Sequence, residues 1–193
     1  KVLDGAGLKV DEALEDRLEA LMAPGATDPR PGNDEMGRFG HDPLPVDRYR
    51  AARSALAARA GGAFRLHLDC ANGAASALAG EILAASGSAV SVHFAEPDGR
   101  NINDGCGATE PDALAAIVAR EGGDAGFAFD GDADRCVAVD EAGRVVDGDR
   151  LIGLIALDRL ARGTLAARTV VVSVLSNGGL VAALDRAGAT TIR

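Results

Sequence analysis

Hydrophobic and polar residues follow two different periods along this chain. Residues 64–70 (FRLHLDC) and 89–95 (AVSVHFA) alternate as half-buried strands do, whereas residues 111–120 (PDALAAIVAR) space their apolar side chains three and four apart, as a helix does. From about residue 64 onward the two kinds of segment take turns. Such alternation predicts an α/β fold with a mixed, mostly parallel sheet whose helices serve as crossovers.

The same pattern gives an expectation for each segment of the chain. Two short extended pieces are expected within 1–10. Helices are expected at 11–22, 47–60, 75–86, 111–120, 151–161 and 179–188. Strands are expected at 64–70, 89–95, 125–130, 167–176 and 189–193, with a hairpin over 136–149 that turns at Glu141–Gly143.

Two segments interrupt the pattern and indicate boundaries. Residues 23–45 contain five prolines among glycines and aspartates, which is typical of a linker rather than of an element interior. The turn at 162–164 precedes a restart of the strand–helix alternation. The chain begins at Lys1 and ends in a strand-like segment, so we expect it to be part of a longer protein.

Composition and charge argue against some classes of binding partner. With 47% hydrophobic and 25% charged residues the chain is typical of a globular protein, and its net charge of −9 argues against nucleic-acid binding. No apolar run approaches the roughly 20 residues that span a bilayer, so no membrane association is expected. Cys70, Cys106 and Cys136 form no paired motif, which favours a reduced, cytoplasmic protein.

The segment FAFDGDADRCVAVD (127–140) carries the strongest chemical signal. Asp130, Asp132 and Asp134 follow a strand-like run, and in a tight loop their carboxylates would repel one another unless a cation lay among them. Carboxylate oxygens suit Mg²⁺ or Ca²⁺ rather than zinc. Arg135 either neutralises this cluster or grips an anion bound to the same metal.

Two other interpretations of this loop are weaker. A solvated acidic turn would need no ligand. An EF-hand loop would match three aspartates and Glu141 at its positions one, three, five and twelve, but its sixth position requires glycine and here is Arg135. The flanks are also strand-like rather than helical, so a metal site between two strands is favoured.

Four separated motifs resemble one enzyme family. DGDADR (130–135) resembles the metal loop of the α-D-phosphohexomutases, whose usual form is DGDGDR. The motifs similar to their phosphoglucosamine mutase branch are DCANGAAS (69–76), EPDGRNINDGCGATEPDAL (96–114) and VVDGDRLI (145–152). The resemblance covers nearly the whole chain. Ala133 stands where glycine is usual, which matters only if the backbone there needs a positive φ.

The resemblance implies a fold, an activity and site residues. The family builds three-layer α/β domains, and the expected parts are the tail of domain 1 plus linker (1–45), domain 2 (46–163) and the start of domain 3 (164–193). It implies interconversion of glucosamine 6-phosphate and glucosamine 1-phosphate through a phosphoserine and a sugar bisphosphate. The three aspartates would hold Mg²⁺, Arg135 would hold the phosphate, and Lys1 would act as acid/base or as an electrostatic partner.

The resemblance also limits what the chain can do by itself. The family's serine, sugar and distal phosphate loops are not among these residues, so the chain alone is expected to be inactive. The implied partner is a phosphorylated amino sugar, and a homodimer is one assembly open to the full-length protein. The alternatives are a phosphomannomutase or phosphoglucomutase, and a non-catalytic metal-binding remnant.

Remaining polar residues have structural explanations. Ser176 or Asn177 is expected to cap a helix, as is the aspartate pair at 147 and 149. His41, His67 and His93 are scattered along the chain and are expected to pack or face solvent rather than bind a ligand.

Overall fold

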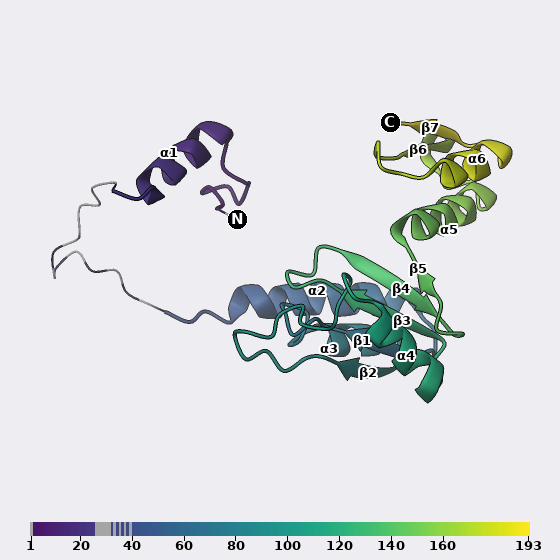
Figure 1. Ribbon diagram of the computed structural model, residues 1–193, viewed down its shortest axis with the longest axis horizontal. Helices are drawn as coiled ribbons and strands as arrows, with labels where there is room; N and C mark the ends of the chain where they lie inside the picture. Colours follow the sequence, from purple (N-terminus) through teal and green to yellow (C-terminus); the bar gives the residue numbers. More distant parts are fainter. Residues whose placement is uncertain (1, 26–31, 33, 35, 37, 39) are drawn as a thin grey trace. The chain divides into compact units, whose positions relative to one another are not determined.

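The computed structural model describes residues 2–25, 32, 34, 36, 38 and 40–193 (Figure 1). The chain divides into two compact units, Lys1–Asp42 and Pro43–Arg193.

In its described residues the first unit contains a small hairpin followed by a helix. Leu3 and Lys9 form an antiparallel bridge, as the extended pieces within 1–10 predicted. Helix α1 (Glu12–Met22) begins after Asp11, whose side chain accepts a hydrogen bond from the Leu14 amide at 2.9 Å. None of its residues is buried within the unit. Within the predicted linker at 23–45, residues 26–31, 33, 35, 37 and 39 lie outside the described residues.

The second unit is built on a five-stranded mixed sheet with the order β2-β1-β3-β4-β5. Its strands are β1 (Arg65–Asp69), β2 (Ala89–His93), β3 (Ala125–Phe129), β4 (Cys136–Asp140) and β5 (Val145–Val146). Strand β1 pairs in parallel with both β2 and β3, whereas β3-β4 and β4-β5 are antiparallel. The mixed sheet with parallel crossovers is confirmed.

Helices cover both faces of this sheet, which gives three layers. On one face α4 (Asp112–Glu121) packs against β3 and β4 through a core of Leu114, Ala115, Val118, Ala128 and Val139. On the other face α3 (Ala79–Ala84) lies over a core of Leu68, Cys70 and Ala75 with Phe127 and Phe129 beside it. Helix α2 (Leu44–Ala60) joins this layer, where Arg50 pairs with Glu81 of α3 at 3.2 Å.

Some helix bounds differ from the predicted ones. The helix expected at 75–86 is α-helical only at Ala79–Ala84, because residues 72–78 form turns with bonds such as Ser76 N–H to the Gly73 carbonyl (3.1 Å). Helix α2 begins before the expected Asp47 and accommodates Pro45 in its first turn, where a missing amide costs no helical bond.

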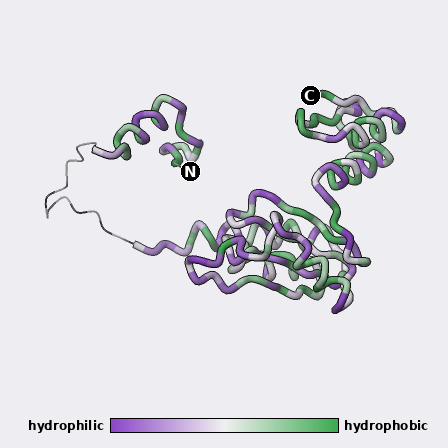
Figure 2. Tube along the Cα trace, in the orientation of Figure 1, coloured by the Kyte–Doolittle hydropathy of each residue, from purple (hydrophilic) through white to green (hydrophobic). Residues whose placement is uncertain are grey.

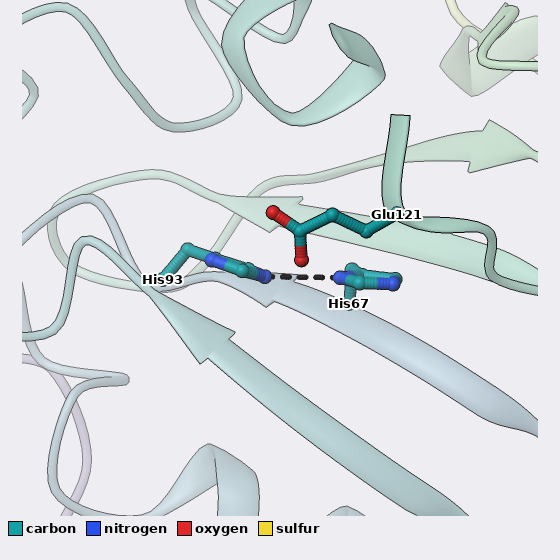
Figure 3. A group of neighbouring side chains, drawn as sticks. All are labelled: His67, His93 and Glu121. Carbon is teal, nitrogen blue, oxygen red and sulfur yellow. Dashed lines mark hydrogen bonds between the residues drawn. The ribbon is translucent and has the colours of Figure 1, made fainter. Parts of the chain in front are cut away.

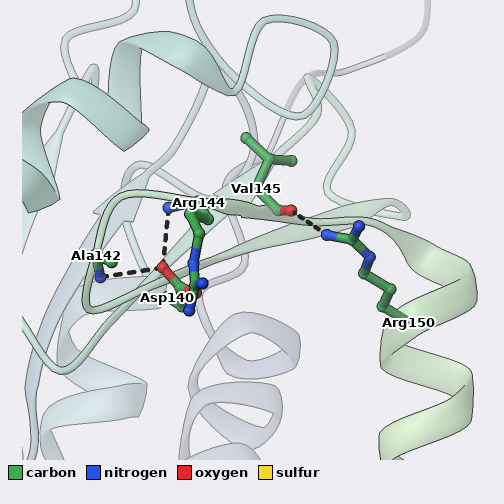
Figure 4. Close-up of polar contacts among 5 residues, drawn as sticks. All are labelled: Asp140, Ala142, Arg144, Val145 and Arg150. Carbon is green, nitrogen blue, oxygen red and sulfur yellow. Dashed lines mark hydrogen bonds and ion pairs between the residues drawn. The ribbon is translucent and has the colours of Figure 1, made fainter.

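The hairpin predicted to turn at Glu141–Gly143 is confirmed, and Asp140 organises it (Figure 4). One Asp140 oxygen, Oδ1, accepts from the amides of Ala142 (3.0 Å) and Arg144 (2.9 Å), and Oδ2 accepts from the Arg144 guanidinium at 2.7 Å. Arg150 donates to the Val145 carbonyl at 3.2 Å and so ties the hairpin to the next helix.

The C-terminal segment has a core of its own. It comprises α5 (Gly148–Ala161), a 3₁₀ turn (Ala166–Arg168), β6 (Thr169–Val171), α6 (Gly178–Arg186) and β7 (Thr190–Ile192), with β6 and β7 parallel. Its buried residues are Ala156, Val172, Leu180, Leu184 and Ala189. Figure 2 shows hydrophobic stretches in both α5 and α6. Helix α5 therefore packs with the segment that follows it, while the domain boundary at 163/164 stays a prediction.

Caps set the start of both C-terminal helices. The Asp147 side chain accepts from the Arg150 amide at 2.9 Å, so α5 begins three residues before the predicted Leu151. The Asn177 side chain accepts from the Leu180 amide at 2.9 Å, which confirms the expected cap on α6. Asp149 does not cap; it accepts from the Asn177 amide at 2.8 Å and joins the two helix starts.

Candidate functional site: an acidic loop at the sheet edge

The acidic loop lies between β3 and β4, at the edge where parallel β1 also ends. Asp130 directly follows β3 and is 2% exposed, whereas Asp132 and Asp134 are exposed. One carboxylate oxygen from each of the three lies within 4.8 Å of the others. The structure thus brings the three predicted aspartates together.

Arg135 joins the cluster through Asp130. Its amide donates to Asp130 Oδ1 at 3.0 Å and its Nε donates to Oδ2 at 2.7 Å. These bonds, that from the amide first, lower the pKa of Asp130 to about 2. Asp130 is therefore ionised at neutral pH, while the 67% exposed Arg135 side chain keeps its remaining N–H groups available.

The donor set fits a hard divalent cation. Three carboxylates in one small loop offer several oxygen lone pairs, and the two bonds from Arg135 leave each Asp130 oxygen with further acceptor capacity. Mg²⁺ prefers one or a few carboxylates and keeps its remaining positions for water or phosphate oxygens. The loop can therefore hold such an ion together with an anion that Arg135 contacts.

The loop turns at Ala133, which has a φ of 59°. Its amide donates to the Asp130 carbonyl at 2.9 Å, and the Asp130 amide donates to the Arg135 carbonyl at 3.3 Å. A non-glycine residue in the left-handed region is strained. The backbone at Ala133 therefore has the positive φ that glycine, the usual residue of the family at this position, adopts without strain.

The turn after β1 contacts the acidic loop through backbone atoms. The Ala74 amide donates to the Gly131 carbonyl at 2.9 Å, and a Cβ on Gly73 would clash with that same carbonyl. Gly73 is thus required for close backbone approach. The left-handed conformations that reverse the chain belong instead to Ala71 and Asn72, with φ of 53° and 48°.

Asp69 holds this turn and a second loop together. It is fully buried, and its two oxygens accept from the amides of Ala71 (2.8 Å) and Gly107 (2.7 Å). Burial raises the pKa of Asp69, opposed by the two backbone bonds. Asp69 therefore connects the turn after β1 to the loop that contains Gly107, and it is not an exposed ligand.

The long polar loop at 96–109 packs against the turn after β1, the end of β3 and the acidic loop. The Asn103 amide donates to the Ala71 carbonyl at 2.9 Å, and the Ala108 amide donates to the Phe129 carbonyl at 2.9 Å. A Cβ on Gly131 would lie only 2.6 Å from Ile102 and 2.8 Å from Asn103. The only sequence signal for this role was a glycine-rich loop too long for a simple turn.

A cavity of about 420 Å³ borders the acidic loop on the side of α2 and α3. Its walls are mostly apolar, and Asp132, Arg53 and Tyr49 are its polar members. The Arg53 guanidinium lies 5.3 Å from the Tyr49 ring centre, a cation–π distance. A positive group thus lines the space that Asp132 faces.

Lys1 lies outside the described residues. His67 and His93, far apart in sequence, are in contact at 3.0 Å. Cys70, Cys106 and Cys136 are free thiols. Among the described residues, no helix has the length and apolar character needed to span a bilayer.

Two known proteins match the full length of this chain. The chain is 43% identical to the phosphoglucosamine mutase of Symbiobacterium thermophilum and 46% identical to that of Frankia alni, and both matches cover 100% of it. The matches span only 43% and 42% of those relatives, so the chain is less than half their length.

Solved structures share the fold of this chain. A phosphoglucomutase/phosphomannomutase family protein from Burkholderia thailandensis superposes with a TM-score of 0.61 at 24% identity, covering 76% of this chain and 32% of its own. An N-acetylglucosamine-phosphate mutase superposes with a TM-score of 0.54 at 19% identity over 74% of this chain and 36% of its own. Residues 47–143 match the family model for the α/β/α domain II of phosphoglucomutase/phosphomannomutase, and the chain belongs to that family.

Proposed function

We propose that this chain is the central part of a phosphoglucosamine mutase, which interconverts glucosamine 6-phosphate and glucosamine 1-phosphate. The observation that carries the proposal is the acidic loop, in which Asp130, Asp132 and Asp134 converge beside Arg135. The named phosphoglucosamine mutases that match the whole chain support the choice of sugar.

In this proposal the three aspartates hold Mg²⁺ and Arg135 positions a phosphate. The ion, when bound, neutralises charge on the phosphoryl oxygens. The bond from Arg135 Nε to Asp130 fixes the guanidinium next to the carboxylates, so that its other N–H groups can contact a phosphate at the same place. Asp69 and Gly73 keep the backbone of the loop in position.

The proposal extends to residues and boundaries that rest on the family resemblance. Lys1 would serve as acid/base or electrostatic partner near the transferred phosphoryl group. Domain 2 would span 46–163, flanked by the end of domain 1 and the start of domain 3. The substrate would be a phosphorylated amino sugar, and the enzyme would work in the cytoplasm.

A chimera tests the proposal. The matching segment of the Symbiobacterium thermophilum phosphoglucosamine mutase is replaced by these 193 residues, and turnover of glucosamine 6-phosphate is measured with and without Mg²⁺. We expect Mg²⁺-dependent turnover, with Asp132→Asn lowering kcat by about 100-fold or more, because one charge-stabilising ligand is lost. Asp158→Asn is the matched control, since it removes an exposed aspartate of α5 that pairs with Arg162 at the end of that helix.

Two results would contradict the proposal. Turnover by Asp132→Asn equal to that of the unsubstituted chimera would remove the acidic loop from catalysis. A folded chimera without any Mg²⁺-dependent turnover would instead favour the alternative of a non-catalytic metal-binding remnant.

A further inference from the structure

His67, His93 and Glu121 come together from three elements on the α4 side of the sheet (Figure 3). His67 is in the middle of β1, His93 ends β2, and Glu121 ends α4. In the parallel register His67 pairs with Ser91, so His93 is its diagonal neighbour on the same face. The fold therefore creates a contact that the sequence separation of these residues conceals.

The three side chains present their donor atoms to one another. His67 Nδ1 and His93 Nε2 are 3.0 Å apart, and the ring planes lie within 15° of parallel with centroids 5.2 Å apart. One donor atom from each residue, including a Glu121 carboxylate oxygen, lies within 4.8 Å of the others. Figure 3 shows the Glu121 carboxylate directed toward the two facing nitrogens.

The surroundings fix the position of His67. It is 5% exposed, and a Cβ on Gly123 would lie 2.6 Å from its Cδ2 atom and 3.1 Å from Nε2. Gly123 thus leaves the space into which the ring fits. His93 is partly exposed and Glu121 is exposed, so the cluster has one buried wall and one side open to solvent.

The three residues supply ligand types that suit a transition-metal ion. Imidazole nitrogens and a carboxylate oxygen are both common zinc ligands. The three donor atoms already lie within 4.8 Å of one another, so little rearrangement is needed to bind one ion.

We propose that His67, His93 and Glu121 form a second metal site, one that takes a zinc-class transition-metal ion. Imidazole nitrogen is a ligand for Zn²⁺, Ni²⁺, Cu²⁺ and Fe²⁺ and is a poor one for Mg²⁺, so this site differs in chemistry from the acidic loop. Two histidines and one glutamate give zinc three protein ligands and leave a fourth position for water.

Without metal, the two rings can share one N–H···N hydrogen bond. Coordination requires both facing nitrogens to be unprotonated, so the ring that donates must carry its proton on its other nitrogen instead. This is a change of tautomer in a neutral ring, with no net loss of a proton. The ion would then link edge strand β2, strand β1 and the end of α4.

Arg120 competes with the ion for Glu121. Its guanidinium donates to the Glu121 carboxylate at 2.7 Å, and its charge opposes a nearby cation. Replacement of Arg120 should leave the three ligands in place and remove this competition. The variants Arg120→Gln and His93→Asn should therefore change metal affinity in opposite directions.

Calorimetric titration of the metal-stripped 193-residue chain with Zn²⁺ tests the site. His93→Asn should weaken the binding by about 100-fold, since loss of a ligand should cost at least as much as loss of a supporting residue. Asp132→Asn should leave it unchanged and Arg120→Gln should tighten it. The ligand variants are His93→Asn and Glu121→Gln, because these two residues are less buried than His67 and their replacement disturbs the fold less. Circular dichroism checks that each variant is folded.

The ligands can be identified independently of affinity. ¹⁵N NMR should show Zn²⁺ shifting the facing nitrogens of His67 and His93, and Co²⁺ should give the intense visible bands of a four-coordinate site. Zinc binding that persists in both His93→Asn and Glu121→Gln, or that disappears in Asp132→Asn, would overturn the proposal. Absence of zinc binding would assign the pair to a hydrogen bond only. None of these outcomes bears on the proposed mutase activity.

Discussion

Ala133 is the one residue of the acidic loop whose backbone conformation is unfavourable for a residue with a Cβ atom. Its φ of 59° lies in the left-handed region, where a Cβ costs about 1–2 kcal/mol. Glycine removes this cost but loses about 0.5–1 kcal/mol of chain entropy on folding.

Ala133→Gly is therefore expected to stabilise the protein slightly, by about 0.5 kcal/mol. Urea unfolding followed by circular dichroism measures the change. Ala142→Gly is the matched control, because Ala142 is outside the set of residues with positive φ and should lose stability on the same substitution. If both variants lost stability equally, strain at Ala133 would not be the cause.

The three aspartates are equivalent in the sequence but not in the structure. Asp130 is buried and bound twice by Arg135, whereas Asp132 and Asp134 are exposed. The alternation of acidic and small residues predicted a metal-binding cluster. Asp130 is held by Arg135 because it directly follows the end of β3, and the sequence pattern did not define that end.

The approach of two loops at the same sheet edge determines the position of the acidic loop. Because β1 and β3 are parallel neighbours, their carboxyl ends meet, and the turn after β1 contacts the loop after β3. Gly73 permits this contact, since any side chain there would clash with the Gly131 carbonyl.

Gly73→Ala should displace the acidic loop and weaken Mg²⁺ binding by about tenfold or more, as loss of a supporting contact commonly does at metal sites. Calorimetric titration with Mg²⁺ gives the affinity. Gly148→Ala serves as control, because a Cβ at this helical position meets nothing within 4 Å. Equal Mg²⁺ affinity in the two variants would show that the close approach has no influence on the loop.

The β4-β5 hairpin should depend on pH through Asp140. Its pKa is lowered, first by the hydrogen bond from the Arg144 amide. A depressed pKa contributes stability that is present above the unfolded pKa, about 4 for aspartate, and is lost as pH falls through the lower folded value. The hairpin is thus expected to weaken in acid.

Asp140→Asn is expected to lower the melting temperature at pH 7. The difference from the unsubstituted protein should shrink toward acid pH, because a protonated aspartate no longer offers a charged acceptor. Thermal melts at several pH values measure this difference. A difference that stayed constant down to pH 2 would mean that the charge of Asp140 contributes nothing.

The second unit as a whole contains separate hydrophobic cores. Two of them flank the five-stranded sheet, and the third lies among α5, α6 and the β6-β7 pair. Leu114 and Leu184 are fully buried in different cores, which makes them a matched pair for testing independence.

Leu184→Ala should destabilise the C-terminal core by about 3 kcal/mol, the usual cost of the cavity that it leaves. Hydrogen exchange should accelerate in 148–192 and stay unchanged in β1 and β3. Leu114→Ala should show the reverse pattern. Uniform acceleration over the whole unit in both variants would indicate a single cooperative core.

The sequence by itself determined the order of strands and helices, the hairpin turn, the caps of α5 and α6 and the acidic loop as a metal-binding candidate. These features depend on local periodicity, turn residues and short motifs, which act over a few neighbouring residues. The start of α3 was predicted four residues too early, at 75 instead of Ala79, because an apolar, alanine-rich segment has helical propensity even where tertiary contacts hold its first residues in turns.

Only the tertiary structure decided which distant residues meet. The sheet register placed His67 beside His93. The parallel pairing of β1 and β3 brought Gly73 into contact with Gly131. Buried Asp69 joined the turn after β1 to the loop at 96–109. Contacts of this kind arise from strand pairing and close packing between segments remote in the chain. No local pattern records them, because each segment alone is compatible with many partners.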